Sequence, residues 1–407
     1  MADPLTPSPQ PIPEDFWEKL EKLYKKEDGD LNEYTKEKPH LIHAFGAVNE
    51  KLNGAFTFCE PVGRGGTGLV VRLEDSRLTV SRALKVPRPK QDEPFEPVRS
   101  EMDYLNTLRH ENIIPLYYFD EVTVPGISKP YPYFVMDYID GAQHLRKRVE
   151  RLVDEVADSK DLKKVTIWVA NAFHRLSGAL EFLHSKNTIH FDVKPSNVLI
   201  DRNDKVILGD LGLAKRKSDS AEDVPVGFTL YYAHPDLRAE YGHMSSKNRV
   251  MGKRRPKDFH FSFDIFAFGK SLLEILALID SKFPDAVPYD YTFAYLHLAA
   301  CRMLDGRNMD KDETMRVREE QVRTGEPLSA YRESCPQLER LDLSGIKDGS
   351  FEEIRKDLQK VLVGEAHIDG VPELNEFYVR RIQIGSQPYC DHFPQRRPHK
   401  AVHPWNI

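Results

Sequence analysis

The side chains with the clearest catalytic potential lie in a short polar loop that runs into a β-branched strand. The loop carries His190, Asp192 and Asn197, and a second apolar run, residues 205–209, ends at Asp210. A carboxylate can orient a hydroxyl and accept its proton, and carboxylate and amide oxygens are ligands that Mg²⁺ takes beside substrate phosphates. The spacing indicates phosphoryl transfer, with Asp192 as proton acceptor and Asn197 and Asp210 as metal ligands. A plain polar turn is the alternative.

A glycine-rich segment lies upstream between two predicted strands. Strands are predicted at 55–62, 69–73 and 78–86, and the first two flank Gly63-Arg64-Gly65-Gly66-Thr67-Gly68. A dinucleotide-binding glycine motif would precede a helix, and a Walker loop would need Lys where this chain has Leu69. Glycines in a hairpin instead let backbone amides approach phosphates. The segment therefore favours nucleotide binding, with a flexible hairpin turn as the alternative.

These two regions together resemble the eukaryotic-type protein kinases. His190-Phe191-Asp192 and Asn197 stand where that family has His-Arg-Asp-Leu-x-x-x-Asn, and Asp210-Leu211-Gly212 stands where it has Asp-Phe-Gly. Phe191 and Leu211 depart from the family pattern. The combination of motifs is specific, because the glycine-rich loop also matches, including the Val that follows it.

The resemblance extends over roughly residues 57 to 300. It implies an α+β, bilobal kinase-like fold with a small β-rich N-lobe and a larger helical C-lobe. The expected parts are an N-terminal extension, the N-lobe with its hinge, the C-lobe and a C-terminal tail, with bounds 1–54, 55–141, 142–365 and 366–407.

The resemblance also implies roles for individual residues. Lys85, in the third predicted strand, would contact the α- and β-phosphates of ATP and be held by Glu101, on a helix predicted over residues 96–109. Lys194 would steady the γ-phosphate, and Asp192 would orient the acceptor hydroxyl. The implied nucleotide contacts come from the glycine loop, the adjoining strands and the hinge, and they are Gly63, Arg64, Gly65, Gly66, Thr67, Gly68, Val70, Ala83, Lys85, Met136, Asp137, Ile139 and Leu199.

Residues 210–236 resemble an activation segment followed by a substrate-docking loop. Pro235-Asp236 stands for the family's Pro-Glu, and the conservative Asp is expected to keep a structural anion. Lys194 in Asp-x-Lys-Pro and Thr229 before the docking loop resemble the serine/threonine branch of the family. The acceptor is therefore expected to be Ser or Thr of a protein substrate, with Tyr left open.

Phe191 occupies the position where many of the kinases that this chain resembles carry Arg. In those relatives the guanidinium pairs with a phosphate on the activation segment and orders it. Phe191 cannot do so, and outside its tyrosines the segment offers only Ser218, Ser220 and Thr229 as hydroxyls. We therefore expect activity without phosphorylation of this segment, and we expect Phe191 to hold the loop by apolar packing.

Two apolar helices are predicted to position the catalytic loop. Residues 162–185 carry apolar side chains at helical spacing and lead directly into the loop. A helix that opens at Ser262 is apolar nearly all round and therefore buried. Its Asp264 is predicted to be structural, because an Asp at a helix N-terminus can accept the first backbone donors of the helix.

Composition narrows the class of protein. A chain of 407 residues, with 40% hydrophobic and 30% charged residues, exceeds the usual size of one core and suggests two lobes. The formal net charge of -6 gives no general attraction to nucleic acid. Four scattered cysteines suggest neither disulfides nor a zinc site. The start of the chain has no signal-like pattern, so a soluble, cytoplasmic protein without membrane contact is expected.

The segments outside the motifs give weaker predictions. The Pro-rich residues 1–13 are expected to be a solvated tail, with a ligand for a proline-binding module as the alternative, and an amphipathic helix follows from Glu14. An apparent insertion, Lys247–Lys257, is strongly basic and could be a solvated loop or a site for an acidic segment. Residues 351–363 form a further amphipathic helix pattern, and a Cys/His metal site in the tail around Cys390 is disfavoured because no regular ligand spacing is present.

The most concrete interpretation is an ATP- and Mg²⁺-dependent serine/threonine protein kinase. Two other classes stay open, a kinase-fold scaffold without useful turnover and a small-molecule phosphotransferase. Intact Lys85, Asp192, Asn197 and Asp210 argue against the scaffold, and the docking loop before Asp236 argues against the small-molecule enzyme.

Overall fold

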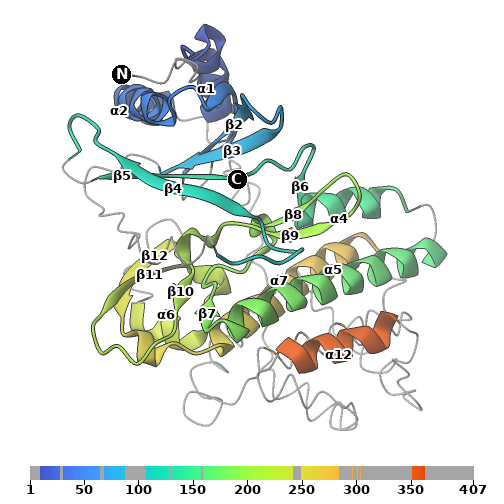
Figure 1. The fold of residues 1–407 in the computed structure, drawn as a ribbon. Helices are drawn as coiled ribbons and strands as arrows, with labels where there is room; N and C mark the ends of the chain where they lie inside the picture. The colour runs from blue at the N-terminus through green and yellow to red at the C-terminus, as the bar shows by residue number, and fades with distance from the viewer. Residues whose placement is uncertain are drawn as a thin grey trace, which may run out of the picture. The chain divides into compact units, whose positions relative to one another are not determined.

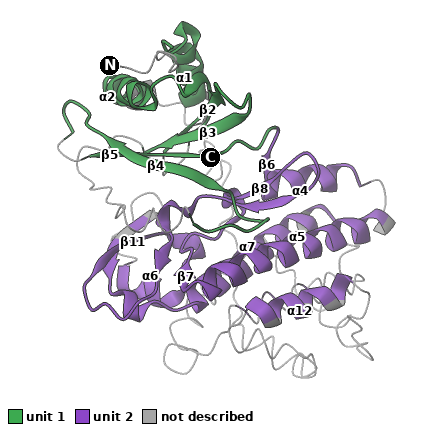
Figure 2. Cartoon of the chain, in the orientation of Figure 1, with its two compact units in different colours: residues 1–140, 400–407 green, residues 141–399 purple. Residues whose placement is uncertain are grey.

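The computed structural model describes most of the two predicted lobes. The described residues are 10–27, 31–64, 68–87, 107–127, 130–156, 159–241, 249–283 and 351–362, with the single positions 296, 300 and 303. The chain divides into two compact units, residues 1–140 with 400–407 and residues 141–399 (Figure 2). The boundary after Asp140 falls within the segment predicted as the hinge. Residues 1–9 of the Pro-rich start and the tail around Cys390 lie outside the described residues. The solvated-tail prediction is wrong for residues 10–13, because Ile12 packs on the core of the first unit and Nδ2 of Asn49 donates to the carbonyl of Gln10 at 2.8 Å.

The first unit is built on a five-stranded antiparallel sheet in the order β1-β2-β3-β5-β4. Its strands are β1 Phe56–Arg64, β2 Leu69–Asp75, β3 Ser81–Val86, β4 Leu116–Val122 and β5 Tyr131–Asp137. The three strands predicted over residues 55–62, 69–73 and 78–86 are present as β1, β2 and β3. Together with the helical second unit, this sheet confirms the predicted α+β class, with a small β-rich unit and a larger helical unit.

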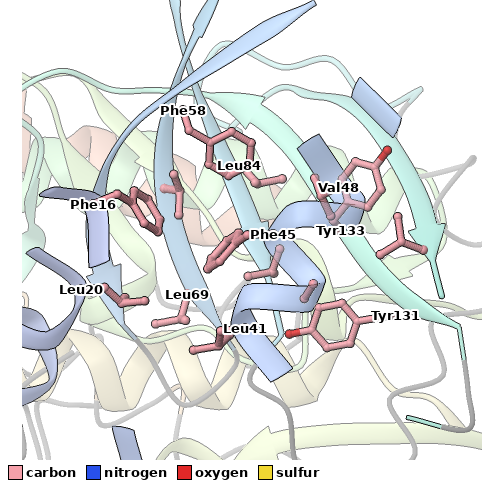
Figure 3. Packing of buried hydrophobic residues seen from close by; sticks show 14 of the residues in the cluster. Phe16, Leu20, Leu41, Phe45, Val48, Phe58, Leu69, Leu84, Tyr131 and Tyr133 are labelled. Atoms are coloured by element: carbon pink, nitrogen blue, oxygen red, sulfur yellow. The ribbon is translucent and has the colours of Figure 1, made fainter. Parts of the chain in front are cut away.

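Two N-terminal helices cover one face of this sheet. They are α1 Glu14–Glu27 and α2 Leu31–Leu52. Phe16 and Leu20 of α1 and Phe45 of α2 are fully buried, and they pack on strand residues such as Phe58 and Leu69 (Figure 3). The N-terminal extension is therefore part of the core of this unit, and α2 is an element that we did not predict.

Removing residues 1–52 should strongly destabilise the first unit, because it uncovers the apolar sheet face. Each large side chain that returns to water costs about 1.5–3 kcal/mol, so we expect the melting temperature to fall by more than about 10 °C or the protein to become insoluble. Calorimetry of the truncated chain, beside a chain that lacks only residues 1–9, tests this. An unchanged melting temperature in the longer truncation would show that the two helices do not contribute to the core.

The second unit is mainly helical. Its helices are α4 Leu145–Asp154, α5 Ser159–Ser185, α6 Pro235–Tyr241, α7 Ser262–Lys282 and α12 Phe351–Leu362. The helix α12 packs along α5 (Figure 1), where Arg355 pairs with Glu181 at 2.9 Å. None of the helices in the described ranges is both long and apolar enough to cross a bilayer.

Short strands in the second unit hold the loops that carry the motifs. They are β6 Gln143–His144, β7 Thr188–Ile189, β8 Val198–Ile200, β9 Val206–Leu208, β10 Lys215–Arg216, β11 Val224–Thr229 and β12 Arg249–Arg254. They form three small sheets, β6-β8-β9, β10-β7 and β11-β12. The solvated-loop interpretation is wrong for residues 249–254, because this part of the insertion is a strand that pairs with β11.

Candidate active site

The loop predicted to be catalytic, which carries His190, Asp192 and Asn197, is fixed by hydrogen bonds of a fully buried histidine. Nδ1 of His190 accepts the backbone N–H of Asp192 at 3.2 Å, so the proton of the neutral ring is on Nε2, which donates to the carbonyl of Gly209 at 3.0 Å. This imidazole therefore ties the catalytic loop to the residue before Asp210.

Asp264 anchors the same loop from helix α7. Its carboxylate is fully buried and accepts the backbone N–H groups of His190 at 2.8 Å and Phe191 at 2.9 Å, and it lies 2.9 Å from Nε2 of His184. The predicted structural role is thus present, but the expected helix cap is wrong, since the N-terminus of α7 has no side-chain cap. The carboxylate binds backbone N–H groups of the loop instead of those of its own helix. Phe191 has a left-handed backbone, with φ of 64°, and in this conformation its N–H donates to Oδ1 of Asp264.

Asp192 lies at the centre of a network that joins this loop to Thr229, the last residue of β11. Oδ1 accepts the backbone N–H of Thr229 at 3.1 Å and its hydroxyl at 2.6 Å. Nζ of Lys194 lies 2.9 Å from Oδ2 of Asp192 and donates to Oγ1 of Thr229 at 2.9 Å. The side chain of Asp192 is only 2% exposed, so these charge-assisted contacts fix its carboxylate in one orientation.

The two predicted metal ligands are brought together by a strand pair. Strand β8 follows Asn197, and β9 precedes Asp210; Val198 pairs with Leu208, and the N–H of Gly209 donates to the carbonyl of Asn197 at 2.8 Å. Nδ2 of Asn197 donates to the carbonyl of Asp192 at 2.8 Å and to its Oδ2 at 3.1 Å. With both amide hydrogens used, Oδ1 of Asn197 is the atom that would ligate a cation.

Asp210 itself has an uncommon backbone conformation, with φ of 54° and ψ of 60°. Non-glycine residues in the left-handed region are uncommon and cluster at functional sites. A Cβ at Gly212 would lie 3.3 Å from Oδ1 of Asp210, so glycine leaves room for this carboxylate. Two oxygen donors on adjacent segments fit Mg²⁺, which completes its shell with phosphate and water oxygens.

In the first unit, the register of the sheet places the predicted nucleotide-binding side chains on one face. Val70 on β2 is opposite Lys85 on β3, and Ala83 is opposite Met136 on β5. Opposed residues of an antiparallel pair share a face, and residues two apart share it too. The intervening Leu84 lies in the core under α1 and α2, so Lys85 is on the sheet face opposite these helices.

The described ends of the glycine loop differ in environment. A Cβ at Gly68 would overlap the backbone carbonyl of Val86, whereas one at Gly63 would meet nothing within 4 Å. Arg64 is 4% exposed, and its guanidinium lies over the ring of Tyr24 at 4.2 Å from the centroid. The side chain of Arg64 is thus packed against α1, so any contact of Arg64 with nucleotide would be through its backbone.

Several other predicted site residues can be located individually. Asp137 pairs with Arg82 at 2.7 Å, and its backbone N–H donates to the carbonyl of Pro115. Ile139 is half-buried near the end of the first unit, and Leu199 lies on β8 in the second unit, opposite Ile207. The remaining predicted site residues lie outside the described residues, and they are Gly65, Gly66, Thr67 and Glu101.

Comparison with known proteins identifies the family. The pattern of the protein kinase domain matches residues 56–278, which is more than half of the 407 residues. The chain belongs to the protein kinase family. This confirms the family predicted from the glycine loop and the catalytic motifs, and it gives the site described above its context.

The curated relatives of this kinase domain include several serine/threonine kinases. Serine/threonine-protein kinase STK11 of Gallus gallus is 31% identical over 179 residues, 42% of this chain and 37% of the relative. A probable serine/threonine-protein kinase of Streptomyces coelicolor is 30% identical over 175 residues, 42% of this chain and 24% of the relative. Mitogen-activated protein kinase kinase kinase 5 of Arabidopsis thaliana is 25% identical over 222 residues, 53% of this chain and 27% of the relative. The chain spans less than half the length of each of these three relatives.

In this kinase domain, Phe191 packs in an aromatic cluster, as predicted. It is 5% exposed, and its ring centroid lies 5.0 Å from that of Phe259 and 5.8 Å from that of Phe263. Val226 and Phe228 of β11 belong to the same cluster. The residue at the position predicted to stand for an Arg of many kinases is therefore part of an apolar cluster that includes strand β11.

A buried charged group next to the docking loop escaped the sequence analysis. Glu274 of α7 is 2% exposed; it accepts a 2.5 Å hydrogen bond from the hydroxyl of Tyr232 and a 2.9 Å hydrogen bond from Arg146. Burial raises the pKa of Glu274, while the bonds from Tyr232 and Arg146 oppose this shift. The sequence does contain a signal for this group, because a glutamate within an apolar helix is buried and therefore needs a hydrogen-bonding or charged partner.

Proposed function

We propose that this chain is an ATP- and Mg²⁺-dependent protein kinase that phosphorylates Ser and Thr hydroxyls of protein substrates. The observation that carries the proposal is the network in which Asp192 is held by Thr229, Lys194 and Asn197. It holds a carboxylate beside the docking segment, where an acceptor hydroxyl would arrive, and it keeps an ammonium within reach of a transferred phosphate.

Each residue in the network supports a separate part of the transfer. Asp192 would orient the acceptor hydroxyl and take its proton. An acceptor bound there would replace the contact between Lys194 and Asp192, and Lys194 would then be available to the γ-phosphate. Asn197 and Asp210 would hold Mg²⁺, which neutralises charge on the phosphates. Lys85 would bind the α- and β-phosphates.

Acceptor specificity is tested with peptides that each contain one hydroxyl residue. We expect labelled phosphate from ATP on Ser and Thr peptides and little on matched Tyr peptides, because Lys194 and Thr229 resemble the serine/threonine branch. Preferential labelling of Tyr peptides would contradict the proposed acceptor. ATP binding without labelling of any peptide or protein would favour a kinase-fold scaffold.

Activity should not require phosphorylation of the activation segment. Phe191 has no charge to pair with a phosphate and instead packs in the cluster with Phe259. The rate of phosphatase-treated protein, with residues 210–236 shown to be unmodified by mass spectrometry, should therefore stay within a few-fold of the untreated rate. The Ser218→Ala/Ser220→Ala variant should behave in the same way. A loss of tenfold or more, about 1.4 kcal/mol in barrier, would mean that another cation reads a phosphate here.

We propose that two lysines of the basic insertion contact acidic substrates. Arg254 pairs with Glu240, and Arg255 pairs with Asp258, while Lys253 and Lys257 are exposed. Replacing these two lysines with Ser should raise KM for acidic peptides selectively, by a few-fold at low salt, since exposed charges are screened by salt. The measurement compares acidic and neutral peptides at two ionic strengths. Equal KM changes for both peptides would leave the lysines as solvated surface charge.

A further inference from the structure

Strand β12 of the basic insertion and strand β11, which ends at Thr229, form one β-ribbon. Strand β12 runs antiparallel to β11 from the pair Val224–Arg254 to the pair Thr229–Arg249 (Figure 1). We infer that β12 is a built-in strand that holds β11 and Thr229 in the position required for substrate docking, so that no phosphate is needed to order this segment. The inference rests on the proposed kinase function and adds a positioning element to it.

One face of the ribbon is buried in the cluster that contains Phe191. Val226 and Phe228 of β11 and Val250 of β12 are all fully buried, and they pack with Phe259. Burial of these side chains depends on the register, because a shift by one residue would turn each of them to the opposite face. The buried side chains of the ribbon therefore fix it to the rest of the second unit.

A close contact at Gly252 fixes β12 against helix α6. A Cβ at Gly252 would lie 2.7 Å from Cδ1 of Tyr241, closer than real Cβ contacts allow, so only glycine fits under this ring. The hydroxyl of Tyr241 donates to the carbonyl of Lys253 at 2.5 Å. Arg254 also pairs with Glu240 of α6. Gly252 and Tyr241 are positioning residues in this account.

The ribbon ends at the catalytic network. Thr229 is the last residue of β11 and pairs with Arg249, and it is also the residue whose N–H and hydroxyl bind Asp192. The register of β12 therefore fixes where Thr229 meets the catalytic carboxylate. In many related kinases a phosphate bound by an Arg supplies this order, whereas here strand pairing and apolar burial supply it.

Hydrogen exchange of the phosphatase-treated full chain tests this inference directly. The backbone amides of residues 224–229 that pair with β12 should be protected in the unmodified protein, to the same extent as in the untreated protein. In Gly252→Ala they should exchange at least tenfold faster while α5 and α7 keep their rates. KM for a protein substrate should rise tenfold or more, with KM for ATP unchanged.

A double-mutant cycle separates the specific contact from general damage. Tyr241→Ala removes the ring that a Cβ at residue 252 would meet, so adding Gly252→Ala to this variant should cause no further loss of protection. Lys253→Thr, at an exposed position of the same strand, is the control and should leave exchange of β11 unchanged.

Two results would overturn the inference. In one, the amides of β11 exchange freely in the phosphatase-treated protein and gain protection only after phosphorylation. In the other, Gly252→Ala keeps full protection of β11 yet loses transfer. If the unmodified protein transfers phosphate to no substrate, the proposed kinase function fails, and the exchange data still decide whether β12 orders the segment.

Discussion

Replacing Asp210 with Ala should reduce phosphoryl transfer by roughly 1,000-fold, about 4 kcal/mol in barrier, while the protein stays folded. Asp210 is half-buried in a left-handed turn, and its carboxylate would be one of two protein ligands of Mg²⁺. Without this ligand Mg²⁺ would bind poorly, and the negative charge on the transferred phosphate would then be uncompensated. The turn itself is held by the His190–Gly209 and Gly209–Asn197 hydrogen bonds, which do not involve this side chain.

The measurement is the steady-state transfer rate of purified Asp210→Ala beside its melting temperature. Asp219→Ala, at an exposed position of the activation segment, is the matched control and should transfer at the rate of the unmodified protein. Undiminished transfer by Asp210→Ala would remove Asp210 from the proposed metal site. A loss of transfer accompanied by unfolding would show a structural role instead.

Replacing Asp192 with Asn should lower kcat by about 10²–10⁴-fold and leave ATP binding nearly unchanged. Asn has the shape of Asp but no charge to hold Lys194 and no basic oxygen for the proton of the acceptor. In addition, an amide nitrogen at the position of Oδ2 would face Nδ2 of Asn197, which is 3.1 Å away. The effect should therefore fall on the chemical step more than on substrate affinity.

Comparison of kcat, KM for peptide and the dissociation constant for ATP decides this prediction. An effect on KM alone would contradict the role of Asp192 in the transfer step. A parallel loss of ATP affinity would indicate that the substitution disturbs the loop through Asn197 and is not specific to catalysis.

The sequence was sufficient to predict the family and to identify the principal polar residues of the candidate site in the second unit. The spacing of His190, Asp192, Asn197 and Asp210 is local, and the intervening strands β8 and β9 are strongly apolar, so the motif and its supporting elements are visible together. The strands around Lys85 were also predicted, because each is a short apolar run rich in β-branched residues and bounded by turn residues, which is a local signal.

The elements that we did not predict depend on partners distant in the chain. Helix α2 contains Pro39 and Gly46, and its apolar positions become a recognisable stripe only beside the sheet that they cover. The strand β12 is rich in basic residues, which disfavour a strand until β11 offers a pairing edge. The carboxylate of Asp264 was predicted on the right helix with the wrong partners, since the turn at Phe191 was not visible in the sequence.

The most direct test of the proposed function is transfer of labelled γ-phosphate from ATP to a peptide whose sole hydroxyl residue is Ser. The purified full chain should label this peptide in Mg²⁺, label its Ser→Ala counterpart not at all, and stop on addition of EDTA. That pattern would agree with acceptor orientation at Asp192 and metal binding at Asn197 and Asp210. Labelling that persists in EDTA, or ATP binding with no transfer to any hydroxyl, would contradict the account.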